Sequence, residues 1–290
     1  MTIEDTAGDL SERRPFWRTA PLSFKVGLAI LGLHLVIAVA GPFIAPFGAV
    51  EIGTGVPVSG MSLQHPMGVD QIGRDVFSRV LHGAHIVILL ALAGTIVGLA
   101  LGSLIGLLSA YIGGLFDEVV QRVIEAFVSI PYIVLGLLTV YAAGPEFGGE
   151  PALMVLVIAI VYAPRIARMA RAAALEVVTR DYVTAARLRG ESALSVIWRD
   201  LAPNTASTLL VEFALRTGYA PALIAAFGFL GFGVQPPTPA WGSMLSESRD
   251  FLYVAWWLAA FPGIALALTA LGVNLLGDWL RDTLDPKLRV

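Results

Sequence analysis

The sequence contains no cysteine and little charge, and both features restrict what the protein can do. Without cysteine, disulfides, thiolate metal sites and cysteine nucleophiles are excluded. Only 14% of the 290 residues are charged, whereas about 25% is usual in a soluble domain. The net charge of −3 provides no basic field, so the composition also argues against a nucleic-acid partner.

Motifs for nucleotide chemistry and catalysis are absent as well. The pattern G-x-x-x-x-G-K-[ST], whose backbone cradles phosphates, does not occur. His82 and His85 are spaced i,i+3, but a nickel site would need further ligands. No ionisable residue inside an apolar run has an obvious catalytic companion. We therefore expect no catalytic residue, no bound metal and no cofactor in this chain, which is not expected to be an enzyme.

Long apolar runs dominate what is present. Hydrophobic residues make up 57% of the chain, and the mean hydropathy is +0.77. Runs of this length can cross a hydrocarbon core of about 30 Å as helices that rise about 1.5 Å per residue. The sequence therefore predicts an all-α membrane protein with six spans, over about 26–44, 86–110, 119–143, 151–169, 209–232 and 254–276.

The positive charges indicate how these spans are oriented. An even number of spans places both ends of the chain on one side. If that side is the cytoplasm, fifteen Lys and Arg residues are cytoplasmic and three are extracytoplasmic, a strong positive-inside bias. This predicts cytoplasmic tails over 1–25 and 286–290, a membrane domain over 26–285, an extracytoplasmic segment over 45–84 and a cytoplasmic loop over 170–204.

Small residues recur at every fourth position of the second span and just beyond it. They are Gly94, Gly98, Gly102, Gly106, Ala110 and Gly114. Small side chains at this spacing let another helix approach closely within lipid. The stripe is explained either by packing within the chain or by an interface with another subunit.

Glu212 and Arg216 lie four residues apart within the fifth span. Charges at this depth are costly, and residues at i and i+4 share a helix face, so each can offset the other. The pair is either a structural contact inside the bundle or part of the polar lining of a translocation pathway.

The loop between the fourth and fifth spans has the signals of a helical hairpin. Asp181 is placed to cap a short helix over 182–189, and Gly190 can adopt the left-handed conformation that ends it. Ser192 can cap a second short helix that stops before Pro203. Taken alone, such a hairpin is a solvated surface feature.

A resemblance to a known family gives this loop a role. The run Ala185-Ala186, followed by Gly190 and Pro203, resembles the "EAA" loop of permeases from binding-protein-dependent ABC importers. Four further segments are similar to the dipeptide, oligopeptide and nickel branch of that family, in order and at compatible spacing: His65–Arg79, Phe116–Pro131, Phe229–Gly242 and Asn274–Arg289. The combination most resembles the second, C-type permease of the peptide importer pair.

The resemblance implies a fold and a set of partners. The fold is a six-helix importer permease with cytoplasmic coupling helices in a bacterial inner membrane. The partners are a homologous second permease, two cytoplasmic ATPase subunits that hold ATP and Mg, an extracytoplasmic binding protein and membrane lipid. The coupling residues would be Asp181, Tyr182, Ala185, Ala186, Arg187, Gly190 and Ser192.

The implied activity is import of short peptides into the cytoplasm. A nickel or other small-solute importer of the same family is an alternative. A secondary transporter that uses no ATP is a further one.

Overall fold

The computed structural model describes residues 20–284, so the predicted tail over 286–290 and most of that over 1–25 lie outside the described residues. The long helices are α2 (Leu22–Ile44), α3 (Val76–Ile112), α4 (Gly114–Ser129), α5 (Tyr132–Ala143), α6 (Pro151–Val178), α9 (Ala202–Phe229) and α11 (Trp257–Leu284). Short helices are α7 (Asp181–Leu188), α8 (Ala193–Val196) and α10 (Trp241–Glu247). Five helical segments can each cross a membrane, and α4 with α5 makes a sixth. The all-α membrane fold is therefore confirmed.

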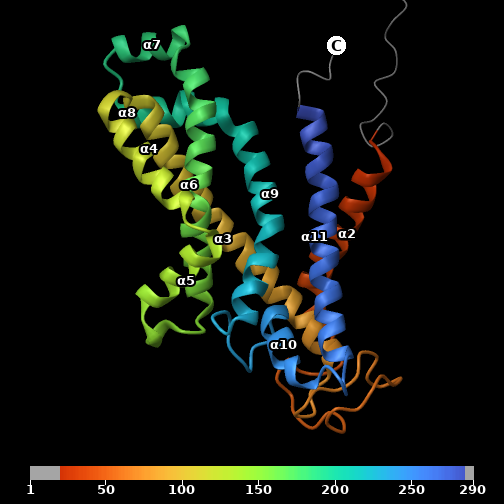
Figure 1. Ribbon diagram of the computed structural model, residues 1–290. Coiled ribbons are helices and arrows are strands. Elements are labelled where there is room, and N and C mark those ends of the chain that lie inside the picture. Colours follow the sequence, from red (N-terminus) through yellow and green to blue (C-terminus); the bar gives the residue numbers. More distant parts are fainter. Residues whose placement is uncertain (1–19, 285–290) are drawn as a thin grey trace, which may run out of the picture.

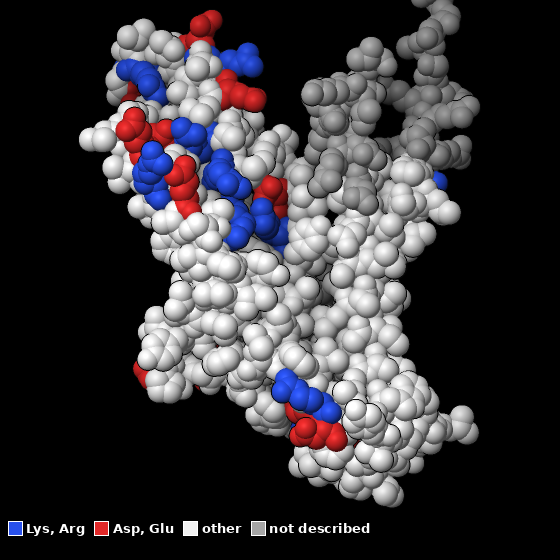
Figure 2. Space-filling model, viewed as in Figure 1, with Lys and Arg blue, Asp and Glu red and all other residues white. Residues whose placement is uncertain are grey.

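The molecule has two distinct ends (Figure 1). The start of α2, the end of α11 and the α7–α8 hairpin lie together at one end, called here the hairpin end. The segment before α3 and the short α10 lie at the opposite end. On the face in Figure 2, charged side chains gather toward the two ends, and a wide uncharged band separates them. This band is what a protein needs along the part that contacts lipid.

The third predicted span is not one helix. It is broken between Ser129 and Tyr132, and α4 and α5 are bent by 99° relative to each other. The cause is Pro131, because a residue that precedes proline is sterically pushed out of the helical conformation. Ile130 accordingly adopts extended backbone angles of φ −76° and ψ 128°.

The second helix begins ten residues before the predicted span over 86–110. The Asp75 side chain accepts a 2.7 Å hydrogen bond from the backbone N–H of Ser78 and so caps α3. The first turns of α3 therefore belong to the predicted extracytoplasmic segment over 45–84. Hydropathy marks where lipid begins, whereas the cap marks where the helix begins.

Two further boundaries differ from expectation at prolines. Helix α6 does not end near 169 but passes through Pro164 and continues to Val178, which shortens the predicted loop over 170–204. Pro203 does not stop a helix either. It is the second residue of α9, and the helical segment runs through it. A π-helical turn over Ile197–Leu201 joins α8 to α9 without a break.

The glycine stripe packs α3 against α6. A Cβ atom at Gly94 would lie 2.6 Å from Ile158 Cβ, and one at Gly102 would lie 2.6 Å from the carbonyl oxygen of Ala163. Only glycine permits so close an approach of the two backbones. Gly114, the last member, begins α4, and a Cβ atom there would meet no other group within 4 Å. Packing within the chain therefore accounts for the part of the stripe that lies in α3.

Buried charges hold the opposite end together. Arg79 donates to Asp70 at 2.6 Å and to Glu247 at 3.1 Å, and Arg74 pairs with the same two carboxylates. The side chains of Arg74, Arg79 and Asp70 are at most 5% exposed. These four residues, called here the ionic cluster, connect the loop before α3, α3 itself and α10. His65 and Asp75 form a neighbouring buried pair at 2.9 Å.

Candidate functional site

The hairpin of α7 and α8 ends its first helix with a glycine turn. Gly190 has φ +77°, a conformation that favours glycine. Its N–H bonds the Arg187 carbonyl at 3.0 Å, and the Glu191 N–H bonds the Ala186 carbonyl at 3.2 Å, the Schellman pattern. The Ser192 side chain accepts from the Ser195 N–H at 3.3 Å and caps α8 as expected.

Asp181 does not cap the first helix, which corrects the expectation. It is the first residue of α7, the N-cap position is Arg180, and no side-chain capping bond forms there. The Asp181 carboxylate still lies in the first turn, where a negative charge interacts favourably with the helix dipole.

Small apolar side chains attach the hairpin to the membrane helices. Val183 and Ala186 of α7 are 0% and 1% exposed. They belong to a buried cluster, called here the hairpin base, which takes residues from α3, α6, α7 and the segment leading into α9: Leu107, Ala110, Ala174, Val177, Val183, Ala186, Val196, Ile197 and Leu201. The hairpin is therefore in direct contact with the ends of two long helices.

Arg187 connects the hairpin to α3, and its side chain remains exposed. Its Nη2 donates to the Tyr111 carbonyl at 2.6 Å, and its guanidinium lies 4.2 Å from the centre of the Tyr111 ring. Arg189 pairs with Glu191 at 2.6 Å. The hydrogen bond from Arg189 lowers the pKa of the Glu191 carboxyl. Arg187 and Arg189 thus both have partners within the chain.

The hairpin instead exposes apolar side chains, which no sequence motif indicated. Leu188 is 84% exposed and Trp198 64% exposed. Leu194 and Tyr182 are also on the surface. Large exposed apolar groups at the polar end of a membrane protein indicate a surface that contacts another protein or the membrane interface. Of the predicted coupling residues, Ala186 is buried and Ala185 is half-buried, whereas the others are exposed: Asp181, Tyr182, Arg187, Gly190 and Ser192.

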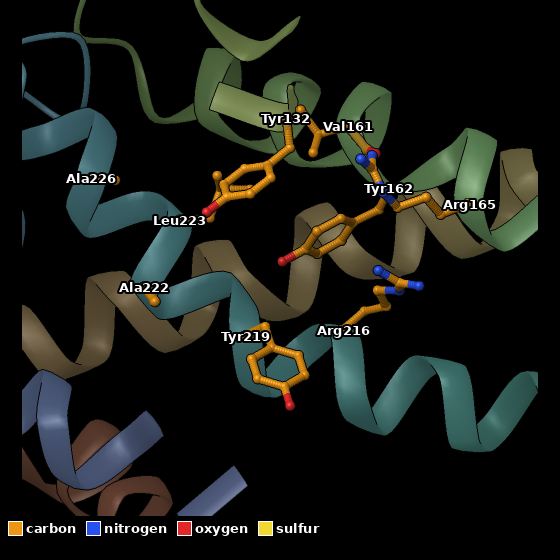
Figure 3. A pocket seen from close by; sticks show the side chains of 9 residues that line it. All are labelled: Tyr132, Val161, Tyr162, Arg165, Arg216, Tyr219, Ala222, Leu223 and Ala226. Carbon is orange, nitrogen blue, oxygen red and sulfur yellow. The ribbon is translucent and has the colours of Figure 1, made fainter. Parts of the chain in front are cut away.

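A second candidate site is a pocket of about 310 Å³ between α5, α6 and α9. Its lining consists of Tyr132, Val161, Tyr162, Arg165, Arg216, Tyr219, Ala222, Leu223 and Ala226. Figure 3 shows the rings of Tyr132 and Tyr162 extending from α5 and α6 toward α9. Three tyrosines and two arginines place polar groups in a recess whose surface is otherwise mainly apolar.

The predicted pair of Glu212 and Arg216 forms, and it stands at the edge of this pocket. Arg216 Nε donates to Glu212 Oε2 at 3.0 Å, and the Arg216 guanidinium lies 5.6 Å from the Tyr162 ring centre. Arg216 lines the pocket, whereas Glu212 does not. Tyr162 and Arg165 were missed because their proximity to Arg216 depends on how α6 packs against α9.

The histidines take part in structural contacts. His85 Nδ1 lies 2.9 Å from the Ala38 carbonyl, and His82 and His85 line a separate recess of about 340 Å³. Within residues 20–284, no three His, Cys, Asp or Glu side chains come together as a metal site would require.

Comparison with known proteins gives consistent matches. Residues 98–290 match the family model described as "Binding-protein-dependent transport system inner membrane component". A putative peptide transport system permease protein of Brucella suis is 37% identical over 268 residues, covering 92% of this chain and 89% of that protein. The dipeptide transport system permease protein of Escherichia coli K12 is 39% identical over 270 residues, covering 91% and 89%.

Among solved structures, the MetNI methionine ABC transporter in an inward-facing conformation is similar. The match is 21% identical, covers 69% of this chain and 94% of that one, and has a TM-score of 0.48.

Proposed function

The chain belongs to the family of binding-protein-dependent transport system inner membrane components, and from this premise we propose that it imports short peptides into the cytoplasm. It is a multi-pass permease of an ABC importer and not an enzyme. The peptide substrate is supported by the names of the Brucella and Escherichia coli relatives, which refer to peptide and dipeptide transport. The arginines of the pocket disfavour the nickel alternative, because they repel a metal cation.

The observation that carries the ATP-driven mechanism is the exposed apolar surface of the hairpin on its buried base. Leu188 and Trp198 offer contacts to a cytoplasmic ATPase subunit, while Val183 and Ala186 pack against the ends of α3 and α6. A shift of α7 would therefore be transmitted to both membrane helices. Nucleotide binding must favour one transporter state by about 5.5 kcal/mol to change its population from about 1% to about 99%.

The proposed assembly contains this chain, a homologous permease, two ATPase subunits carrying ATP and Mg, and an extracytoplasmic binding protein. The hairpin end would face the cytoplasm, in agreement with the bias of fifteen positive residues against three. Both termini would then be cytoplasmic. The pocket that contains Arg216, with the adjacent Glu212, would form part of the translocation pathway.

The first test is purification of the tagged chain from native membranes in mild detergent, followed by mass spectrometry. We expect a second permease and at least one ATPase subunit to copurify. The complex, reconstituted in liposomes with its binding protein, should accumulate radiolabelled dialanine only when ATP is present. Purification of this chain alone, in a detergent that preserves known complexes, would favour the secondary transporter.

Coupling is tested by Leu188→Asp with Leu63→Asp as the matched control. Both leucines are highly exposed, at 84% and 105%, but Leu63 lies at the end opposite the hairpin. The charge at position 188 should reduce ATP-dependent uptake at least about tenfold, because one buried apolar contact and the desolvation of a charge exceed about 1.4 kcal/mol. Equal uptake by the two variants would refute the coupling role.

A further inference from the structure

The pocket between α5, α6 and α9 carries an excess of positive charge. Glu212 offsets Arg216 at 3.0 Å. Arg165 instead donates through Nη1 to the Val161 carbonyl at 3.1 Å. Among the side chains that the structure describes, no carboxylate lies within ion-pair distance of Arg165. The pocket therefore has one positive charge that no described carboxylate offsets.

The pocket also offers hydrogen-bond donors that the chain does not use. Tyr219 donates its hydroxyl to Asn274 Oδ1 at 3.1 Å and is engaged. For the hydroxyls of Tyr132 and Tyr162, no hydrogen-bond partner occurs within the described part of the chain. Figure 3 shows both rings on the same side of the recess, near the α9 residues that close it.

We propose that this pocket holds the carboxylate terminus of the peptide during its passage, an inference that rests on the proposed peptide transport. The guanidinium groups of Arg165 and Arg216 supply the charge for the carboxylate, and the hydroxyls of Tyr132 and Tyr162, which extend away from both guanidinium groups in Figure 3, offer donors to the adjoining part of the peptide. Guanidinium and carboxylate are complementary because two parallel N–H donors meet two oxygens. The volume of about 310 Å³ lies at the lower end of small-molecule pockets and suits one end of a short peptide.

Glu212 sets the strength of this site. A pathway must bind its substrate well enough to admit it and weakly enough to release it. Two uncompensated arginines would hold a carboxylate more strongly than one. Because Glu212 neutralises Arg216, the site retains the attraction of one net positive charge. The same carboxylate keeps Arg216 oriented toward the recess when no peptide is bound.

The experiment measures peptide binding to the full transporter complex in nanodiscs without the binding protein, by saturation-transfer NMR. The probes are trialanine and trialanine amide, which differ only in the terminal carboxylate. In the wild-type complex, trialanine should bind about tenfold more tightly than the amide, the factor expected for a hydrogen bond to a charged group. Arg165→Gln should abolish this preference, and Arg165→Lys should restore part of it.

Arg168→Gln is the matched control, since Arg168 is exposed on the same helix one turn further and does not line the pocket. It should keep the preference for the free acid. Equal binding of acid and amide by the wild type, or an unchanged preference in Arg165→Gln, would overturn the inference. Neither result affects the proposed function, which fails separately if the wild-type complex shows no ATP-dependent uptake of dialanine.

Discussion

The two ends of the molecule are held together by opposite kinds of contact. At one end, the ionic cluster buries charged side chains: Arg79 is 2% exposed and bonds two carboxylates. At the other end, the hairpin base buries apolar side chains, and the ion pair of Arg189 and Glu191 lies at the surface. Buried ion pairs require one specific geometry, whereas small apolar contacts tolerate small displacements. We therefore expect the end with the ionic cluster to be rigid and the hairpin to move.

The largest expected effect comes from opening the ionic cluster with Arg79→Met. Asp70 and Glu247 would each lose a buried partner, at a cost of about 3–5 kcal/mol. Thermal unfolding in detergent, followed by size-exclusion chromatography, should show a much lower midpoint. Arg122→Met is the control, because its pair with Glu125 is 85% and 63% exposed and such pairs contribute about 1 kcal/mol at most. Equal shifts in the two variants would remove the contrast between buried and surface pairs.

A smaller loss of stability is expected from a substitution in α3, the helix that connects the two ends. Gly102→Ala would place a methyl group 2.6 Å from the Ala163 carbonyl oxygen and force α3 and α6 apart, costing about 1–3 kcal/mol. Gly32→Ala in α2 meets no atom within 4 Å and should be neutral or stabilising, because alanine favours helix. In unfolding midpoints measured in parallel, the first variant should therefore fall below the wild type and the second should not.

Amide hydrogen exchange can compare the mobility of the hairpin with that of the end that holds the ionic cluster. Amides of α7 should exchange at least about tenfold faster than those around Asp75–Arg79, since α7 buries only Val183 and Ala186. Val183→Ala should accelerate exchange in α7 further, by about tenfold, through the lost packing. The neighbouring Thr184→Ala, at an exposed position, should leave it unchanged. Slower exchange in α7 than around the ionic cluster would contradict the assignment of movement to the hairpin.

The smallest expected effect on stability is that of acid pH, acting through Asp70. Burial alone raises the pKa of Asp70, but N–H donors and positive charge from Arg74, with further charge from Arg79, bring it below its ordinary value of 3.8. A carboxyl with a lowered pKa stabilises the fold above the ordinary value, and the contribution is lost as pH falls through the lowered one. The unfolding midpoint should thus be insensitive to this group between about pH 7 and about pH 5 and fall below about pH 4. Asp70→Asn should have a flatter profile there.

Three prolines explain why hydropathy predicted the spans but not the helix boundaries. Pro131 breaks a span because Ile130 turns extended, Pro164 lies inside α6 without ending it, and Pro203 falls in the first turn of α9. All three residues are prolines, yet the outcomes differ. Whether a proline ends the helix depends on which neighbouring groups satisfy the backbone carbonyl that it frees. Apolar length alone predicts that a segment crosses the membrane, not where its helix begins or ends.

The sequence predicted those features of the two sites that depend on residues close together in the chain. The spacing of Glu212 and Arg216 predicted their ion pair, and Gly190 and Ser192 predicted the turn and cap of the hairpin. Contacts between distant segments were not predictable. The bond from Arg187 to Tyr111 joins residues 76 positions apart, and the pocket combines three helices. The coupling and pathway roles of these residues remain predictions.

Helix α3 has a further consequence for the membrane around the protein. Its 37 residues extend about 55 Å at about 1.5 Å per residue, far more than a hydrocarbon core of about 30 Å. Figure 1 shows it crossing the molecule obliquely. Its start contributes Arg79 to the ionic cluster, and its end contributes Leu107 and Ala110 to the hairpin base. Since bilayer thickness influences the tilt of a long helix, lipid chain length should adjust the height of the hairpin above the membrane and with it the rate of transport.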